Sequence, residues 1–436
     1  MKRLFPDYTY GPGPRQNCWW DETIAAPDWP ILNGDLSVDV AIVGGGFTGL
    51  SAALYLAEAG TSVAVLEAAT PGWGASGRNG GFCCLGGSKL SHSAMTRQFG
   101  LEAAESYEQA ECDAVQLVAD LLETHKIDAD THSNGETQLA HSARAMEKLR
   151  RNAEDTGILH EAGELQGLGF GGDFHGGYTN PVGFGLNPRK YLFGLASAAE
   201  SQGARLFQKT AAESIRKTQF GFDIQTGTGV IRAANVLICT NGYSSEDVPQ
   251  WMSGRYMPTQ STVLVTRPLS ETELQAQGWT SNQICYDTRN LLHYFRLMPD
   301  RRFLFGMRGG LRSSPKAEVA IRRTVQQDFL RMFPKWKDVE VSHMWSGMVC
   351  LSRNLMPYAG PVPNQSGLFA AFAYHGNGVA MGTYCGRALA RMVLSQPDEL
   401  PQPIAQPPSR FPLGSWRRAL MPPAYAAMAI ADRWSL

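Results

Sequence analysis

The chain has 436 residues, and a chain of this length is more often divided into two packed domains than built around one core. Hydrophobic residues make up 43% of it and charged residues 18%, which is typical of a globular protein and excludes a disordered or collagen-like one. Its 39 lysines and arginines balance 40 acids, which excludes a basic surface for nucleic acid.

The first 35 residues are rich in proline, glycine and tryptophan, and they predict an irregular arm on the surface. Residues 1–10 lack the apolar centre of a secretory signal, and no apolar run approaches the roughly 20 residues that span a bilayer. We therefore expect a cytoplasmic protein without a membrane anchor.

Regular structure is expected to begin with a βαβ unit. The apolar run at residues 38–43 is typical of a buried parallel strand. After a glycine turn, apolar spacing predicts a helix over residues 48–59, which Gly60 ends, and a second strand over residues 62–66. The crossover between the two strands should be right-handed.

Three helices are predicted in the middle of the chain. Two of them, over residues 101–122 and 142–154, have apolar side chains at helical spacing. The third has Asn187 as its N-cap, Pro188 in its first position and Gly203 as its stop.

The second half of the chain is richer in strands, and it contains no internal repeat. A last long helix is expected over residues 378–393, and a proline-rich linker, residues 400–412, leads to a helical tail over residues 416–434. The tail could touch a membrane, but its few arginines favour a helix docked on the surface. The expected strands are residues 205–207, 221–225, 235–239, 262–265, 291–296 and 303–306.

The eight cysteines are scattered, and only Cys83 and Cys84 are close in sequence. No C-x-x-C spacing and no clustering of cysteine with histidine is present, so neither a metal site nor a disulfide framework is expected. Most of these thiols should be small buried apolar groups.

The strongest motif is the glycine turn that follows the first strand. Gly44 permits the tight turn, Gly46 lets the backbone approach a pyrophosphate, and Gly49 lets the helix pack on the strand. The helix N-terminus offers free N–H groups and a partial positive charge to the phosphates. Glu67, at the end of the second strand, is placed to accept hydrogen bonds from ribose hydroxyls and would repel the 2′-phosphate of NADP.

A second glycine-rich stretch, residues 71–81, favours FAD over NAD. It follows the second strand directly, and its backbone N–H groups can wrap a diphosphate and approach a flat ring system. Arg78 within it adds positive charge for a phosphate.

These two motifs resemble the D-amino-acid oxidase and sarcosine oxidase family of flavoproteins, and within it the gamma-glutamylputrescine oxidases. The glycine fingerprint that ends in Glu67 and the stretch from Gly74 to Gly81 carry the resemblance. Similar blocks extend it over nearly the whole chain, at residues 18–20, 235–243, 345–347, 356–360 and 374–379.

The resemblance implies an α/β (α+β) fold, in which a Rossmann-type FAD-binding domain is interleaved with an antiparallel-sheet substrate domain, as in D-amino-acid oxidase and glutathione reductase. The implied parts are an arm over residues 1–36, an FAD-binding domain over 37–95, 185–260 and 345–400, a substrate domain over 96–184 and 261–344, and a tail over 401–436.

The resemblance also implies where FAD binds. The helix that starts at Gly376 to Val379 should point its positive end at the flavin pyrimidine. The implied cofactor-binding residues are Gly44, Gly46, Phe47, Thr48, Gly49, Glu67, Ala68, Gly74, Ala75, Ser76, Arg78, Asn79, Gly80, Gly81, Ala212, Thr240, Asn241, Gly242, Gly347, Gly376, Asn377, Gly378 and Val379.

Two departures from the family pattern are visible. The family motif has serine-glycine-histidine-glycine where this chain has His375-Gly376-Asn377-Gly378, so the histidine has moved. Cys350 is out of register with the cysteine that bonds covalently to flavin in sarcosine oxidases. We therefore expect non-covalent FAD.

Substrate-site candidates come from the strand near residue 294 and from the blocks beside the flavin. Tyr294 and His375 are the candidate catalytic residues. Arg296 is a candidate for binding a substrate carboxylate, while Trp345 and Phe82 are candidate aromatic contacts.

The predicted reaction is oxidation of an amine. A hydride passes from the carbon beside a neutral amine to flavin N5, the imine hydrolyses to an aldehyde, and O₂ becomes H₂O₂. The resemblance favours a small-molecule amine with a gamma-glutamyl group. Two alternatives stay open: oxidation of an N-methyl or D-amino acid with another electron acceptor, and a catalytically silent FAD-binding scaffold. The oligomeric state is not indicated by the sequence.

Overall fold

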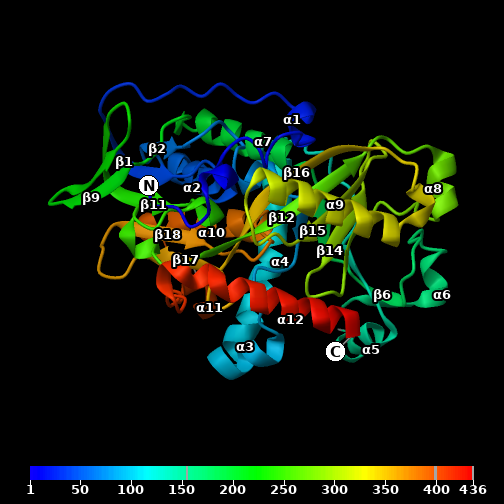
Figure 1. The fold of residues 1–436 in the computed structure, drawn as a ribbon. Helices are drawn as coiled ribbons and strands as arrows, with labels where there is room; N and C mark the ends of the chain where they lie inside the picture. The colour runs from blue at the N-terminus through cyan, green and yellow to red at the C-terminus, as the bar shows by residue number, and fades with distance from the viewer. Residues whose placement is uncertain (154–155, 397–399, 435–436) are drawn as a thin grey trace.

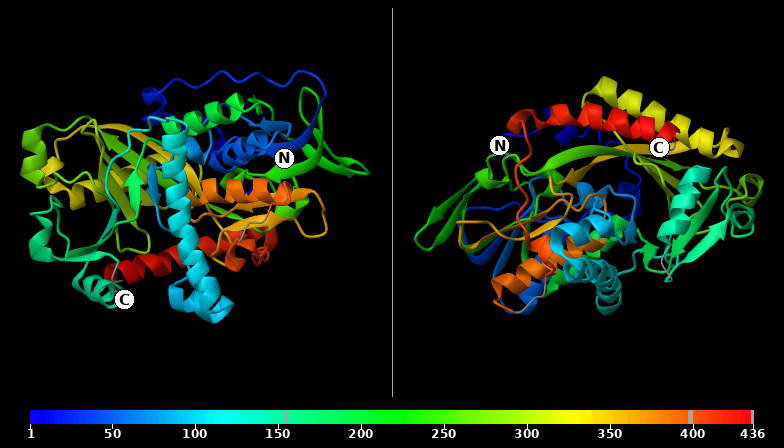
Figure 2. Two further views of the ribbon diagram at one scale, coloured as in Figure 1. Left: turned by 180° about the vertical axis from the view of Figure 1, so that it is seen from behind. Right: turned by 90° about the horizontal axis from the view of Figure 1, so that it is seen from below.

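A computed structural model describes residues 1–153, 156–396 and 400–434 of the chain. Two eight-stranded sheets organise these residues, and they lie on opposite sides of the view in Figure 1. The long helix α4 (Leu101–Thr124) runs between the parts that hold the two sheets (Figure 2). A small ladder of β3 (Phe82–Cys84) and β7 (Gly183–Gly185) completes the strands.

The first sheet contains the predicted βαβ unit. Its central strands are parallel, in the order β18-β11-β1-β2-β8, and β17 and the β9–β10 pair add antiparallel edges. Both faces of the central strands are buried, which explains their continuous apolar sequences. Its strands are β1 (Leu36–Val43), β2 (Val63–Leu66), β8 (Arg205–Phe207), β9 (Ser214–Thr218), β10 (Gly221–Gln225), β11 (Val230–Ile238), β17 (Tyr358–Pro361) and β18 (Leu368–Phe372).

Helices cover one face of this sheet. Helix α2 (Phe47–Glu58) packs against both α7 (Pro188–Ser201) and α10 (Ala380–Val393), and α4 packs against α10. Asn187 caps α7 as predicted, because its side-chain oxygen accepts hydrogen bonds from the N–H groups of Arg189 and Lys190.

The second sheet is mostly antiparallel, in the order β16-β12-β15-β14-β13-β4-β6-β5. Its outer face packs on α9 (Pro315–Met332) through a cluster rich in aromatic rings, including Trp279, Phe303 and Phe333. Its strands are β4 (Glu136–Leu139), β5 (Ile158–Glu161), β6 (Gly176–Asn180), β12 (Met257–Thr266), β13 (Ile284–Asp287), β14 (His293–Leu297), β15 (Phe303–Arg308) and β16 (Val341–Leu351).

The remaining helices are short or peripheral. They are α1 (Trp20–Thr23), α3 (His92–Phe99), α5 (Ala143–Asn152), α6 (Ala162–Leu165), α8 (Glu271–Gln277), α11 (Gln402–Ala405) and α12 (Met421–Trp434). The helix predicted over residues 142–154 is therefore α5, and its expected last residue lies outside the described residues, as do residues 397–399 and 435–436 of the predicted domain and tail. Strand β12 spans the predicted domain boundary between residues 260 and 261, and strand β16 spans the one between residues 344 and 345. The predicted domain boundaries remain a proposal.

The N-terminal arm differs from its prediction. It contains a 3-10 helix (Asp7–Tyr10) and α1, and it is not confined to the surface. Trp20 and Trp29 are each only 2% exposed because the arm packs into the body of the protein. Proline and glycine indicated an irregular backbone, but the arm's tryptophans gain more from burial than from solvent.

The C-terminal tail is helical, as predicted. A 3-10 helix (Gly414–Leu420) precedes α12, which crosses toward the second sheet in Figure 1. Arg417 is fully buried in a bidentate ion pair with Glu246, so it anchors the tail rather than facing solvent. Within the residues that the structure describes, no helix is long and apolar enough to span a bilayer.

Candidate active site

A cavity of about 600 Å³ extends from the glycine turn after β1 to the inner face of the second sheet. Such a volume lies within the range of cofactor and small-molecule sites in proteins. One end is lined by Glu67 and Ala212, and the other by Tyr294 and Arg308.

The glycine turn has the geometry that its sequence predicts. Gly44 has φ +110°, a conformation that side chains disfavour. A Cβ on Gly49 would lie 2.0 Å from the carbonyl oxygen of Gly44, so α2 approaches β1 only with glycine there. Gly46 gives α2 no side-chain cap, and in its first turn the N–H of Phe47 donates to Ser76 Oγ at 3.1 Å, so the positive end of the helix faces the cavity beside Ser76.

Glu67 lies at the end of β2, beside this turn. Its carboxylate accepts hydrogen bonds from the N–H groups of Gly45 and Ala69, at 3.2 and 2.9 Å. Burial raises the pKa of the Glu67 carboxyl, although the two N–H groups oppose the shift. The residue is thus held where a ribose would meet it.

Arg78 belongs to the second glycine-rich stretch and is 2% exposed. Its guanidinium fixes that stretch through hydrogen bonds to neighbouring backbone groups. Its Nε donates to the carbonyl of Trp73 at 2.6 Å, and its Nη1 donates to Ser346 at 3.1 Å. Its Nη2 is buried without a hydrogen-bond partner in the described chain. Because Arg78 lines the cavity, this unused donor is suited to an anionic ligand.

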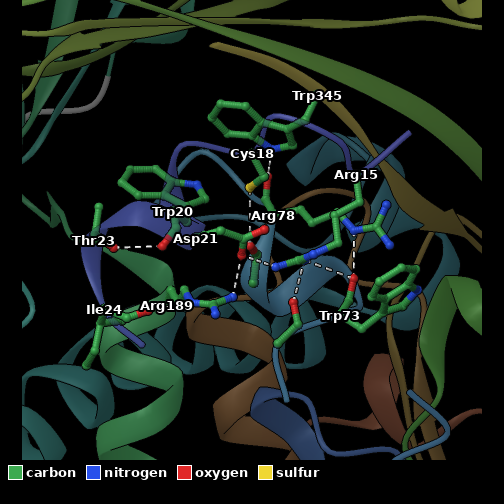
Figure 3. Close-up of polar contacts among 12 residues, drawn as sticks. Arg15, Cys18, Trp20, Asp21, Thr23, Ile24, Trp73, Arg78, Arg189 and Trp345 are labelled. Atoms are coloured by element: carbon green, nitrogen blue, oxygen red, sulfur yellow. Dashed lines mark hydrogen bonds and ion pairs between the residues drawn. The ribbon is translucent and has the colours of Figure 1, made fainter. Parts of the chain in front are cut away.

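The arm fastens the same stretch from outside (Figure 3). Arg15 donates to the carbonyl of Gly72, and Trp20 Nε1 donates to that of Asn79, both at 2.8 Å. Asp21 accepts hydrogen bonds from both Arg15 and Arg189 and so ties the arm to α7. These arm residues were not predicted as part of the site.

His375 precedes α10 and is fully buried. Its Nδ1 donates to the carbonyl of Gly87 at 2.7 Å, and its Nε2 accepts from the N–H of Ser352 at 3.2 Å. Burial lowers the pKa of His375 to about 3, so the ring is neutral. Both ring nitrogens are occupied in holding loops around the start of α10.

The inner face of the second sheet forms the far wall. Tyr294 lies across Gly306 on the neighbouring strand, where a Cβ would come within 2.1 Å of the tyrosine ring. Its hydroxyl lies 2.9 Å from Ser261 Oγ. Phe82 meets the Tyr294 ring edge-on, and Tyr286 lines the same wall.

Three charged side chains line this end of the cavity: Glu136 from β4, Lys89 from the segment after β3, and Arg308 from β15. Glu136 is 6% exposed, and burial raises its pKa to about 8. Arg308 donates from Nη2 to the carbonyl of His375 at 2.9 Å. None of the three forms an ion pair with another residue of the described ranges.

The cavity brings together most of the predicted site residues. Gly49, Gly81 and Gly242 lie behind its surface, and so do Arg296 and Trp345. The predicted residues on its surface are Gly44, Gly46, Phe47, Thr48, Glu67, Ala68, Gly74, Ala75, Ser76, Arg78, Asn79, Gly80, Phe82, Ala212, Thr240, Asn241, Tyr294, Gly347, His375, Gly376, Asn377, Gly378 and Val379.

Arg296 lies away from the cavity surface, contrary to its expected position. It is 1% exposed, and its guanidinium donates to the carbonyl of Leu186 and to His132 Nε2, at 2.7 and 3.2 Å. Trp345 is fully buried, and its Nε1 donates to the carbonyl of Arg78 at 2.7 Å. Both residues support the loop that covers them.

The cavity fits a dinucleotide at one end and a flat ring system near β3 and α10. A model of the FAD-dependent oxidoreductase family DAO matches residues 39–392. The chain belongs to this DAO family. The family is FAD-dependent, so FAD is the cofactor of this protein.

Individual relatives agree over most of the chain. It is 31% identical over 429 residues to "Probable oxidoreductase OrdL" of Rhizobium meliloti, covering 95% of this chain and 97% of that protein. It is 29% identical over 368 residues to gamma-glutamylputrescine oxidoreductase of Escherichia coli, covering 83% and 85%. These relatives support an FAD-dependent amine oxidoreductase.

The fold of the DAO family is visible in solved structures as well. Glycine oxidase from Geobacillus kaustophilus superposes with a TM-score of 0.69 at 22% identity, over 85% of this chain and 99% of that one. L-proline dehydrogenase from P. horikoshii gives the same TM-score at 19% identity, over 85% and 96%. The expected fold class is thus confirmed.

Cys350 also bears on how this DAO family member holds FAD. It lines the cavity, and burial raises the pKa of its thiol to about 12. A thiol needs its thiolate form to act as a nucleophile. All eight cysteines are free thiols.

Proposed function

We propose that the protein oxidises a primary amine with O₂ as electron acceptor. The substrate carbon beside the amine loses a hydride and the nitrogen loses a proton, which leaves an imine. Water then converts the imine to an aldehyde and ammonia, and O₂ takes up two electrons and two protons to become H₂O₂. Bound FAD supplies the two-electron acceptor for the substrate.

The observation that carries this proposal is the mainly aromatic wall opposite the FAD-binding end. Tyr294, Phe82 and Tyr286 surround a space where an amine would lose much of its hydration. Low polarity favours the neutral form of an amine, which is the form that gives up a hydride. We propose that Tyr294 orients the amine through its hydroxyl.

His375 takes a different part in the proposal from the one expected from the sequence. With its Nδ1 donating to Gly87 and its Nε2 accepting from Ser352, it has no free nitrogen to move a proton. We propose that His375 is a positioning residue, which fixes the chain where α10 begins.

The proposed substrate is a diamine that carries a gamma-glutamyl group on one nitrogen. The name of the Escherichia coli relative, gamma-glutamylputrescine oxidoreductase, supports this choice. The second candidate is an N-methyl or D-amino acid, whose carboxylate is also of the kind that Arg308 in the cavity binds.

Anaerobic stopped-flow absorbance of the FAD-loaded protein tests both candidates. We expect gamma-glutamylputrescine to bleach the flavin band rapidly, and we expect sarcosine and D-amino acids to bleach it at least about tenfold more slowly. Admitting air should then restore the band and yield one H₂O₂ per amine. Bleaching by D-amino acids alone would favour the second candidate, and bleaching by no amine would leave a silent FAD-binding scaffold.

A further inference from the structure

We infer that the cavity has two separated ionic subsites, Glu136 for an ammonium group and Arg308 for a carboxylate, and that the substrate is an elongated amine bearing an anionic far end. This inference rests on the proposed amine oxidation and specifies the substrate class. Neither subsite was predicted from the sequence.

Glu136 forms no ion pair in the described chain, although the positive charge of Lys89 in the same cavity opposes the rise of its pKa. It is 6% exposed and lines the cavity, and within the described ranges the thiol of Cys84 is its hydrogen-bond partner. A buried carboxyl without an ion pair costs stability, and Glu136 limits that cost by holding a proton at neutral pH, since its pKa is about 8. A substrate ammonium brings a positive charge and three N–H donors, which favour the carboxylate form of Glu136. The amine then has to lose a proton before it can give up a hydride.

Arg308 is a cation without an acid. One of its donors, Nη2, is used by the carbonyl of His375, and that contact fixes the guanidinium at the edge of the cavity. No carboxylate in the described part of the chain lies within ion-pair distance of it, and its positive charge lowers the pKa of Lys89. The unused donors suit a carboxylate, which a guanidinium binds through two parallel hydrogen bonds.

The distance between the subsites selects the shape of the substrate. Arg308 lies on β15 and Glu136 on β4, and two strands, β14 and β13, separate them in the sheet. Three inter-strand steps amount to about 14 Å between the strand axes. A compact α-amino acid has its ammonium and carboxylate on one carbon and cannot reach both groups. An extended chain with a terminal amine and a distant carboxylate can.

Other titratable groups surround the two subsites. Cys84, Glu111, Cys285 and Tyr286 face Glu136, while Tyr294, Tyr425 and Cys84 face Arg308. Lys89 interacts with both Arg308 and Glu136: the charge of Arg308 lowers the pKa of Lys89, and the charge of Glu136 opposes that shift. A bound carboxylate near Arg308 and Lys89 would relieve the repulsion between these two cations.

The test compares two amines that share a reactive end. Gamma-glutamylputrescine carries a distant carboxylate, and N-acetylputrescine does not. In the wild-type protein, we expect the first to half-saturate anaerobic flavin bleaching at a concentration about 10- to 100-fold lower than the second. In Arg308→Gln this ratio should fall to near one, and Arg308→Lys should keep part of it. In Glu136→Gln both amines should bind more weakly by a similar factor.

A binding measurement without turnover complements these rates. L-glutamine carries the far end of gamma-glutamylputrescine but lacks its reactive amine, so its binding should shift the flavin absorbance band without bleaching it, and Arg308→Gln should raise the half-saturating concentration about tenfold or more. Arg301→Gln, at an exposed position after β14, is the matched control and should change neither value. Each variant is first checked for its flavin-to-protein ratio and its Tm.

The outcomes separate this inference from the proposed function. If both amines bleach the flavin equally well and Arg308→Gln changes neither, amine oxidation stands and the ionic subsites are refuted. If Arg308→Gln weakens both amines by the same factor, Arg308 does not bind the far carboxylate. If no amine bleaches the flavin, the proposed function itself fails, but the shift of the flavin band on titration with L-glutamine still reports whether Arg308 binds the anionic end.

Discussion

At the scale of single residues, the site is built from side chains whose usual partners are missing. Arg78 keeps a buried donor unused, and Arg308 and Glu136 have no ionic partners in the described chain. Such groups reduce the stability of the folded protein until a ligand pairs with them. Their concentration along one cavity is the physical mark of a binding site, and it has a measurable consequence for stability.

Replacement of Glu136 by glutamine should change how stability depends on pH. Glu136 has a pKa of about 8 in the folded protein, above the value of about 4.3 for a free glutamate. Between these values the folded protein holds a proton that the unfolded chain releases, so stability falls as the pH rises, by up to about 1.4 kcal/mol per unit. The Tm of Glu136→Gln should therefore exceed the Tm of the wild type by a margin that grows from pH 5 to pH 8.

Thermal unfolding of the FAD-loaded protein without amine, at several pH values, measures this effect. Glu123→Gln, at an exposed position on α4, should follow the wild-type curve throughout. A Tm difference between wild type and Glu136→Gln that stays constant from pH 5 to pH 8 would show that Glu136 is already ionised in the folded protein at pH 5.

At the scale of elements, the FAD-binding end depends on segments that pack against the glycine-rich stretch. The arm holds that stretch through Arg15 and Trp20, and Asp21 joins Arg15 to Arg189 on α7. Both arginines are nearly buried, at 8% and 5% exposure, so the single shared carboxylate offsets part of two positive charges that water hardly reaches.

Asp21→Asn should therefore loosen the arm and the cofactor together. We expect a loss of about 1–3 kcal/mol in the free energy of unfolding, because two charge-assisted hydrogen bonds become weaker. FAD should also be released faster, since the carbonyls of Gly72 and Asn79 lose their ordered donors. Urea unfolding and the rate of flavin release on dilution measure the two effects, with Asp338→Asn at an exposed position as the control. If Asp21→Asn released flavin at the wild-type rate, the arm would not contribute to cofactor binding.

At the scale of the whole molecule, the C-terminal tail connects the two sheets. Arg417 pairs with Glu246, which lies in the segment after β11 of the first sheet. Farther along the tail, Asp432 accepts hydrogen bonds from Asn290 and from the N–H of Leu291 in the β13–β14 loop. The next residue, Leu292, lines the cavity. The tail lies beyond residues 39–392, which the family model matches, so this connection is additional to the matched core.

Asp432→Ala should release the β13–β14 loop without unfolding the protein. We expect faster amide hydrogen exchange at residues 288–292, and a KM for the amine raised about threefold or more while the flavin content stays constant. Met428→Ala, on the exposed side of the same helix, is the matched control. Equal exchange in wild type and Asp432→Ala would show that the loop does not need the tail.

The sequence by itself determined the βαβ unit, the glycine fingerprint and the cofactor class. Each of these depends on local pattern: an apolar strand, glycines at the positions where a Cβ would clash, and an acid at the end of the next strand. The cap of α7 and the stop at Gly60 were predictable for the same reason. The predicted domain limits were not tested.

Only the tertiary structure decided which charged residues line the cavity. Tyr294 and Arg296 are two residues apart on β14 and therefore point to the same face of the sheet. Leu186 and the glycine-rich stretch cover Arg296, while Tyr294 stays open to the cavity. Glu136, Lys89 and Arg308 come together from segments far apart in the chain. Strand order and register decide which side chains become neighbours. Both depend on contacts spread over the whole core, so no short stretch of sequence encodes these neighbours.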